Sequence, residues 1–175
     1  MTFDIAKKAL DYVVNNFYIL KEKKLDNRIH NIKITFFGGE PLLCWNDIIV
    51  PLVLYAEEKY KDVEIIFTLT TNGILLDKNK LSFLKYHNIP FILSCDGNEK
   101  ASIKRVNKNG DNSFHILNKT IKTITEYAPE TIMRATVSPE TVTELFNSFL
   151  YSMENNFETI SFVPNCRTSW NDNDI

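Results

Sequence analysis

The chain has 175 residues, of which 44% are hydrophobic and 24% are charged, as is typical of one compact domain with its own core. Its formal net charge is −2 at pH 7, and Lys and Arg are scattered along the chain, which argues against nucleic acid or an anionic membrane surface as a partner. No apolar run approaches the ~20 residues of a membrane span, and the start of the chain lacks the apolar core of a signal peptide, so we expect a cytosolic protein.

Helical patterns alternate with short β-rich runs along the chain. A helix is predicted first, over residues 3–17, where apolar residues recur at helical spacing. Strands rich in β-branched or aromatic residues are predicted over residues 32–37, 64–70, 91–94, 131–137 and 159–163. Helices are predicted between them, over residues 47–60, 78–86, 113–127 and 139–155, with Ser113 and Ser138 as N-caps and Pro139 in the first turn. This order indicates an α/β fold in which crossover helices join parallel strands.

The two faces of these predicted strands differ in polarity. Polar side chains share one face by period-2 spacing: Thr68, Thr70, Asn72, Ser94, Asp96, Arg134 and Thr136. Apolar side chains occupy the other: Phe67, Leu69, Leu93, Met133 and Val137. The order of elements alone fits both a doubly wound sheet and a barrel. A polar inner lining under an apolar outer layer favours a partial parallel (β/α) barrel around a polar ligand.

Polar groups also follow the ends of four consecutive predicted strands, where ligands bind in parallel α/β folds. The first strand ends in Gly38, Gly39 and Glu40, where two glycines let the backbone approach a ligand and a carboxylate can meet a cation or an amine. The next strand ends carry residues 70–73, 94–97 and 134–136. Paired glycines alone most often form a tight turn, but four polar strand ends in succession indicate a ligand site.

These strand ends resemble the radical SAM superfamily. The matching segments are FFGGEPLL at 36–43, TLTTNGILL at 68–76, ILSCDG at 92–97 and MRATVSPE at 133–140. The resemblance spans nearly the whole chain and is strongest to the SPASM-type branch that modifies peptides and proteins, which includes anaerobic sulfatase-maturating enzymes and thioether-forming peptide maturases. It implies that residues 1–175 form part of a radical SAM core domain. It also implies a parent enzyme that cleaves S-adenosylmethionine reductively, with a [4Fe–4S] cluster, to modify a peptide or protein.

The resemblance implies a set of cofactor-binding residues: Gly38, Gly39, Glu40, Thr71, Asn72, Ser94, Asp96 and Arg134. In the family, the motif matched by Gly38, Gly39 and Glu40 holds the amino group of the cofactor's methionine part. Arg134 falls at a position suited to the cofactor carboxylate, which a guanidinium can bind through two hydrogen bonds. Arg105 matches an arginine that follows the S-x-D-G segment in this branch.

The cluster ligands are where the chain departs from the family. The family's C-x₃-C-x₂-C motif would precede the first predicted helix, so we expect a truncated chain without the first barrel strand and the cluster loop. The three cysteines present lie far apart, whereas clusters draw thiolates from a short local loop: Cys44, Cys95 and Cys166. We expect Cys95 to be a small buried hydrophobe and the other two to lie in loops. We therefore predict that this chain alone binds no cluster and has no activity.

Other candidate sites carry less weight. The histidines have no second ligand at i+3 or i+4, so no metal role is predicted for them: His30, His87 and His115. Two alternatives to the enzyme fragment stay open. One is a cluster-free remnant that acts as a nucleoside-binding or protein-interaction domain. The other is an unrelated barrel enzyme that uses Asp96 or Glu40 as an acid or base.

The outermost predicted strands have a consequence for assembly. Residues 32–37 and 159–163 would each present an open sheet edge, and such edges invite pairing between chains. We therefore expect a homo-oligomer formed through the open edges.

Overall fold

The computed structural model describes residues 1–23, 30–106 and 109–171. Five strands occur in this part of the chain: β1 (Ile32–Phe36), β2 (Ile65–Thr71), β3 (Phe91–Ser94), β4 (Ile132–Val137) and β5 (Thr159–Pro164). The α-helices are α1 (Phe3–Glu22), α2 (Val50–Lys59), α3 (Lys78–Tyr86), α4 (Phe114–Tyr127) and α5 (Leu145–Glu154). Short turns complete the elements: the 3₁₀ turns η1 (Pro41–Cys44) and η3 (Val142–Glu144), and the π-helical turn η2 (Trp45–Ile49). The predicted order of helices and strands is confirmed.

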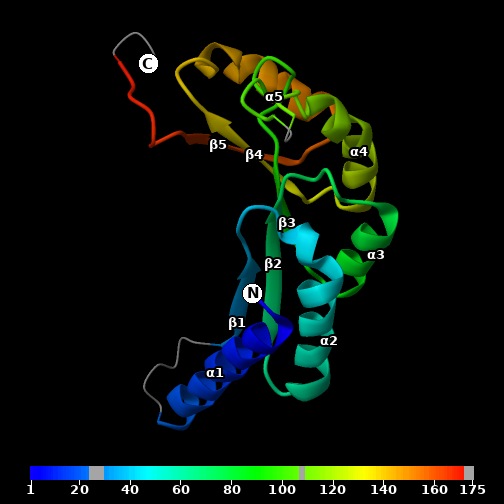
Figure 1. Ribbon diagram of the computed structural model, residues 1–175, viewed down its shortest axis with the longest axis vertical. Helices are drawn as coiled ribbons and strands as arrows, with labels where there is room; N and C mark the ends of the chain where they lie inside the picture. The colour runs from blue at the N-terminus through cyan, green and yellow to red at the C-terminus, as the bar shows by residue number, and fades with distance from the viewer. Residues whose placement is uncertain (24–29, 107–108, 172–175) are drawn as a thin grey trace.

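All five strands form one parallel sheet in the order β1-β2-β3-β4-β5. Strands that are consecutive in the chain are therefore neighbours in space. The strand direction rotates along the sheet, from near vertical in β1 and β2 to near horizontal in β5, while the helices lie along its outer side (Figure 1). Parallel strands in sequential order with helices on one side form part of a (β/α) barrel. The predicted α/β class and partial barrel are confirmed.

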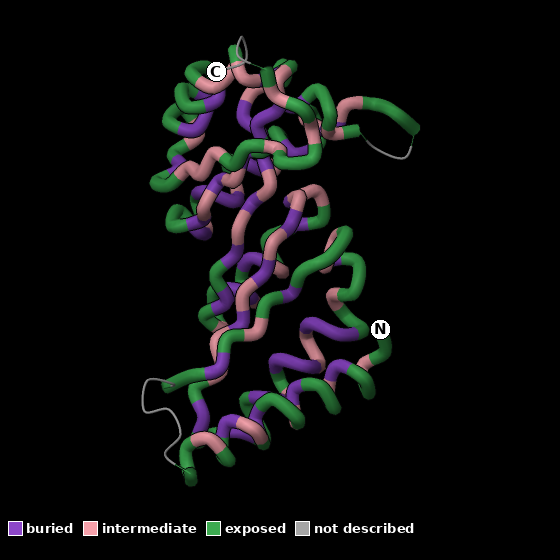
Figure 2. Tube along the Cα trace, turned by 90° about the vertical axis from the view of Figure 1, so that its left-hand side faces the viewer, coloured by how far each residue is buried: buried purple, intermediate pink, exposed green. Residues whose placement is uncertain are grey.

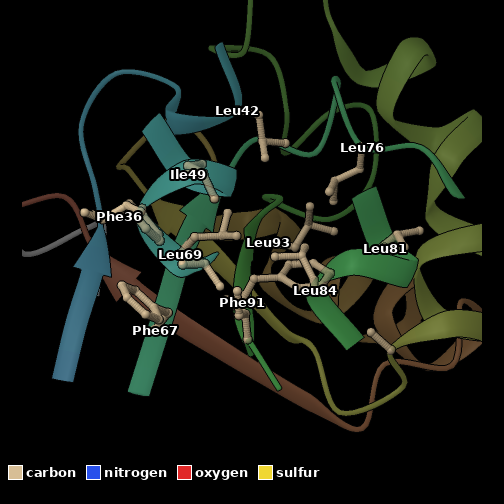
Figure 3. Packing of buried hydrophobic residues seen from close by; sticks show 14 of the residues in the cluster. Phe36, Leu42, Ile49, Phe67, Leu69, Leu76, Leu81, Leu84, Phe91 and Leu93 are labelled. Atoms are coloured by element: carbon tan, nitrogen blue, oxygen red, sulfur yellow. The ribbon is translucent and has the colours of Figure 1, made fainter. Parts of the chain in front are cut away.

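The outer face of the sheet builds the hydrophobic core. In β1 to β4 alternate residues point beneath the helices, and their burial alternates along the chain trace (Figure 2). Phe36 and Phe67 stack on neighbouring strands with ring centroids 5.5 Å apart. Leu69 and Leu93 continue this layer toward the helices (Figure 3). Burial of these side chains is the main stabilising contribution to the fold.

The inner face of the sheet is polar toward the carboxyl ends of the strands and is only partly covered. Thr68, Thr70, Ser94 and Arg134 are half-buried, while the outer-face residues between them are buried. This is the alternation predicted from the sequence, and it leaves a polar surface on the concave side of the sheet.

Helix α1 continues to Glu22, beyond its predicted end at residue 17, and α2 begins at Val50, after the turn η2, rather than at residue 47. Two predicted N-caps also do not form. The predicted helix at 139–155 begins as α5 only at Leu145, because Thr141 Oγ1 hydrogen-bonds the backbone N–H and C=O of Ser138 and holds a turn there. The predicted cap at Ser113 also fails: its hydroxyl donates to the Arg105 carbonyl at 2.9 Å, and Asn112 Oδ1 accepts the first helical N–H instead. Both errors involve short polar side chains that bind neighbouring backbone groups.

Two strands in the described part of the chain have a strand neighbour on one side only, namely β1 and β5. The predicted edge strands are thus correct. None of the helices described has the length and apolar character that crossing a bilayer demands.

Candidate ligand site at the strand ends

Glu40 joins the end of β1 to the end of β2. Its Oε1 accepts the Thr71 hydroxyl at 2.7 Å and the Leu42 backbone N–H at 3.1 Å, and its Oε2 accepts the Asn72 backbone N–H at 2.8 Å. Three of the predicted site residues are therefore brought together. A carboxylate has about four lone-pair positions, so one acceptor position stays free for a further donor.

Gly38 and Gly39 form the loop that leads to this carboxylate. A Cβ added to either glycine would meet no atom within 4 Å, so the packing of the protein does not exclude a side chain there. Gly38 has φ +149°, a conformation that other residues rarely adopt. The loop thus presents bare backbone to open space, as the sequence predicts for a surface that approaches a ligand.

Gly73, which follows β2, has a different role. A Cβ on Gly73 would lie 2.4 Å from Leu93 Cδ1 and 2.8 Å from Leu117 Cδ1, and φ is +76°. Thr71 beside it is buried, and its Oγ1 accepts the Gly73 N–H at 3.0 Å. Gly73 is therefore required by packing, and it lets the chain turn sharply next to Asn72.

Asp96 forms a second polar group at the strand ends. Its carboxylate accepts two hydrogen bonds from Arg105, from Nε and from Nη2, each at 2.6 Å, and the Thr136 N–H donates to it at 2.8 Å. Only 7% of Asp96 is exposed. Sequence reasoning placed Asp96 in the cofactor site and did not foresee its pairing with Arg105. The Thr136 N–H joins Asp96 to β4.

Arg134 is a cationic residue of the inner face. It lies opposite Ser94 on β3 and Ser161 on β5 in the strand register. Its Nε is buried and has no hydrogen-bond partner among the described residues. Arg134 also lines a cavity of about 330 Å³ on the inner face, whose other polar lining residues include one carboxylate: Lys33, Thr35, Thr68, Thr70 and Glu130.

Lys33 and Thr35 were missed by the sequence analysis. Thr35 Oγ1 lies 2.9 Å from Thr68 Oγ1, so the two hydroxyls share a hydrogen bond across the first two strands. In the alternation of the strand, both residues point to the inner face. The same alternation, extended into β1, would have predicted them.

The cysteines lie as the sequence predicts. Cys95 is fully buried, and burial raises the pKa of its thiol to about 11, whereas Cys44 and Cys166 are exposed in the turns after β1 and β5. Within residues 1–23, 30–106 and 109–171, no three His, Cys, Asp or Glu side chains gather into a group that could hold a metal ion.

Comparison with known proteins identifies relatives of this chain. No family model matches the sequence. An uncharacterized protein of Methanocaldococcus jannaschii is 37% identical over 110 residues, which cover 63% of this chain and 34% of the relative. The radical SAM cyclopropyl synthase TigE of Paramaledivibacter caminithermalis is 28% identical over 151 residues, covering 86% of this chain and 30% of the relative. The chain is related to radical SAM enzymes.

Further comparisons agree with this relationship. A cysteine-type anaerobic sulfatase-maturating enzyme of Clostridium perfringens is 24% identical over 163 residues, covering 87% of this chain and 44% of the relative. Among solved structures, native anSMEcpe with bound AdoMet shares the fold at a TM-score of 0.67 and 22% identity, covering 79% of this chain and 38% of that chain. Streptococcus suis SuiB bound to precursor peptide SuiA has a TM-score of 0.54 and 23% identity, with 84% and 31% covered. The expected resemblance to radical SAM enzymes is thus confirmed, and the chain spans less than half the length of each curated relative named here.

Proposed function

We propose that this chain is the S-adenosylmethionine-binding part of a radical SAM enzyme that modifies a peptide or protein. Residues 1–175 then form part of the core domain of that enzyme. The proposed cofactor contacts surround the strand ends: Gly38, Gly39, Glu40, Thr71, Asn72, Ser94, Asp96 and Arg134. Support comes from a radical SAM relative, from a structural neighbour that binds AdoMet, and from another that binds a peptide.

The buried Nε–H of Arg134, which has no hydrogen-bond partner among the described residues, is the observation that carries this proposal. A buried N–H without a partner costs about 1–3 kcal/mol, so proteins rarely keep one unless a ligand, ion or water satisfies it. Arg134 Nε is such a group, and the residue lines the inner cavity. The carboxylate of S-adenosylmethionine would supply two acceptors in the fork geometry that a guanidinium prefers.

The loop of Gly38 and Gly39 is suited to bind the amino group of the methionine part of S-adenosylmethionine. The open space beside both glycines lets backbone atoms reach a ligand, and Glu40 keeps one acceptor position free. An ammonium group needs acceptors only, and carbonyl and carboxylate oxygens provide them. The loop and Arg134 would thus bind groups of opposite charge on one zwitterion.

The described residues do not fit a [4Fe–4S] cluster. Such a cluster needs thiolates, and the raised pKa of Cys95 keeps that thiol protonated, while Cys44 and Cys166 belong to the turns after opposite edge strands. In radical SAM enzymes the cluster supplies the electron for reductive cleavage of the cofactor. We therefore propose that these residues bind and orient the cofactor and that this chain alone neither holds the cluster nor has activity.

A titration of S-adenosylmethionine into the protein by calorimetry tests the binding function. Arg134→Gln should weaken binding by about 10–100-fold, because a hydrogen-bonded charge pair contributes about 1.5–3 kcal/mol. Lys119→Gln, which removes one positive charge from the exposed surface of α4, should leave the affinity unchanged. No binding by the unmodified protein, or equal affinity of the Arg134 variant, would reject the proposed site.

Anaerobic reconstitution with iron and sulfide tests whether this chain alone can hold a cluster. The expected result is no tightly bound iron in this chain and S-adenosylmethionine binding that does not depend on iron. Such a result would also fit the alternative function, a cluster-free nucleoside-binding or protein-interaction domain. Stoichiometric iron with the absorption band of a cluster would instead contradict the proposed inactivity of the chain.

A further inference from the structure

Ser161 continues the polar row around Arg134 onto β5. In the strand register Arg134 lies between Ser94 of β3 and Ser161 of β5. Residues that are paired in a parallel register point to the same face of the sheet, so all three side chains lie on the inner face. Each of the three residues is half-buried. The row belongs to the face of the sheet and not to a strand edge, so a further strand beside β5 would leave it unchanged.

The two serine hydroxyls are available to a ligand. No hydrogen bond joins either of them to another residue in the described ranges. One step toward the amino ends, the inner-face positions of β3 and β4 are apolar, where Ile92 pairs with Ile132. The polar groups of these two strands are thus concentrated at the level of Arg134, which lines the inner cavity.

The pair of Arg105 and Asp96 shows the kind of partner that Arg134 lacks. Arg105 binds the Asp96 carboxylate side-on, through Nε and Nη2, each at 2.6 Å, and the Thr136 N–H is a third donor at 2.8 Å. Arg134 lies on the strand next to Asp96, and its buried Nε has no acceptor among the described residues. A ligand carboxylate bound side-on would satisfy this Nε in the same way.

The donors of the row match the acceptors of one carboxylate. A carboxylate has about four lone-pair positions. Arg134 bound side-on supplies two donors, and one serine hydroxyl on each side supplies another. Neighbouring strands lie about 4.8 Å apart, so both hydroxyls flank the same ligand group. Nε is the guanidinium nitrogen nearest to the backbone, so a group bound to it lies at a depth that short serine side chains can reach.

The nearby carboxylates of the described chain do not fill this position. Asp96 is bound by Arg105 through both of its oxygens. Glu130 also lines the inner cavity, but it precedes β4 and lies toward the amino end of the sheet, away from the level of Arg134. The acceptor that would complete the row is therefore a group that the described residues do not supply.

We infer that Ser161 donates a hydrogen bond to the carboxylate of S-adenosylmethionine, beside Arg134 and Ser94. This role rests on the proposed function, in which Arg134 binds that carboxylate, and it adds a residue of β5 to the site. Ser161 would then determine specificity, because the row favours a ligand that carries a carboxylate over the same ligand without one.

Calorimetric titrations with S-adenosylmethionine and with decarboxylated S-adenosylmethionine test this role. Ser161→Ala should weaken binding of S-adenosylmethionine by about 10-fold, the loss expected for one hydrogen bond to a charged group. The same variant should bind the decarboxylated ligand as the unmodified protein does, because that ligand has no carboxylate for the hydroxyl to bind. Ser161→Thr keeps a hydroxyl and should retain most of the affinity for S-adenosylmethionine.

Thr159→Val is the matched control. It removes a hydroxyl from the same face of β5, one step toward the amino end and opposite Ile132, and it should leave both affinities unchanged. Circular dichroism confirms that each variant is folded.

Three results would overturn the role of Ser161. Equal affinity of Ser161→Ala and the unmodified protein for S-adenosylmethionine would remove Ser161 from the site and leave the proposed function intact. An equal loss for both ligands would mean that the hydroxyl supports the site without binding the carboxylate. No binding of either ligand by the unmodified protein would reject the proposed function itself, and the role of Ser161 with it.

Discussion

Arg105 and Asp96 form a charge pair with two parallel hydrogen bonds, and both side chains are largely removed from solvent, with 22% and 9% of their surfaces exposed. The Thr136 N–H also donates to Asp96. The pair therefore fastens the loop after β3 to the neighbouring strand. Breaking one partner of such a pair leaves the other charge buried without compensation.

Arg105→Gln should lower the free energy of unfolding by about 3–5 kcal/mol, because among the described residues the Asp96 carboxylate then keeps only the Thr136 N–H as a donor. Urea unfolding followed by circular dichroism measures the loss. Lys104→Gln is the control: it removes the neighbouring ion pair with Glu140, in which both side chains are more than half exposed, and it should change the free energy of unfolding far less than Arg105→Gln does. Equal losses in the two variants would mean that the Arg105 pair contributes no more than a surface contact.

Substitution by alanine should affect the stability of the protein very differently at two glycines that follow strands. A Cβ on Gly97 would lie 2.4 Å from Ser148 Cβ and 2.7 Å from its Cα, and φ is +107°, so Gly97→Ala should destabilise the protein by several kcal/mol or prevent folding. Gly39→Ala meets nothing within 4 Å and should leave the melting temperature nearly unchanged. The same Gly39 variant should weaken S-adenosylmethionine binding if the loop approaches the cofactor. Unchanged binding would remove Gly39 from the proposed site.

The three thiols should differ in reactivity toward a disulfide reagent. Cys44 and Cys166 are exposed and should react quickly in the native protein, while Cys95 should react only on unfolding, because it is buried and its pKa is raised to about 11. The absorbance released by the reagent, measured with and without denaturant, counts the thiols that react in the native protein and those that react only on unfolding. Cys95→Ala should leave the fast phase unchanged and abolish the slow one. A fast third thiol in the native protein would contradict the burial of Cys95.

Asp11 should make stability depend on pH in the acid range. Burial acts to raise the pKa of its carboxyl, but hydrogen bonds from Tyr60, Tyr55 and Lys59 outweigh that effect and lower the pKa. A carboxyl whose pKa is lower in the folded state stabilises the protein above its ordinary pKa of 3.8, and this contribution is lost as the pH falls below that value.

Asp11→Asn should therefore lower the free energy of unfolding by about 1–2 kcal/mol at neutral pH, and the difference from the unmodified protein should shrink at pH below about 4. Urea unfolding at several pH values measures it. Glu58→Gln, which changes an exposed carboxyl on α2, should alter the free energy by less than about 0.5 kcal/mol. If the difference in free energy of unfolding between Asp11→Asn and the unmodified protein stayed constant down to the lowest pH, the lowered pKa of Asp11 would not be its cause.

The fold could be predicted from the sequence to within a few residues for most elements. Helix α3 and strand β3 match their predicted bounds, because Asp77 caps the helix locally and β-branched and aromatic residues mark the strand. Start positions failed where a side chain binds nearby backbone, as Thr141 does. Periodicity describes which face a residue occupies, but it contains no information on such local hydrogen bonds.

The candidate site was predictable in composition but not in its pairings. Strand-end residues could be grouped because parallel strands end at one edge. The partnership of Asp96 with Arg105 depends on how the loop after β3 folds back, and the partnership of Glu40 with Thr71 depends on the alignment of two strands. Neither pairing can be predicted from the spacing of residues along the chain, because the relative positions of the joined segments depend on the whole sheet.

The glycine loop after β1 is an arch with both ends fixed. Phe36 belongs to the β1–β2 ladder, and Glu40 is bound to Thr71 and Asn72 at the end of the same neighbouring strand. Only three residues lie between these two fixed positions, so the glycine loop has little freedom to move relative to β2. A ligand that binds the arch meets backbone groups already ordered, and it loses less conformational entropy than it would on a free glycine loop. Two glycines can thus be accessible and pre-organised at the same time.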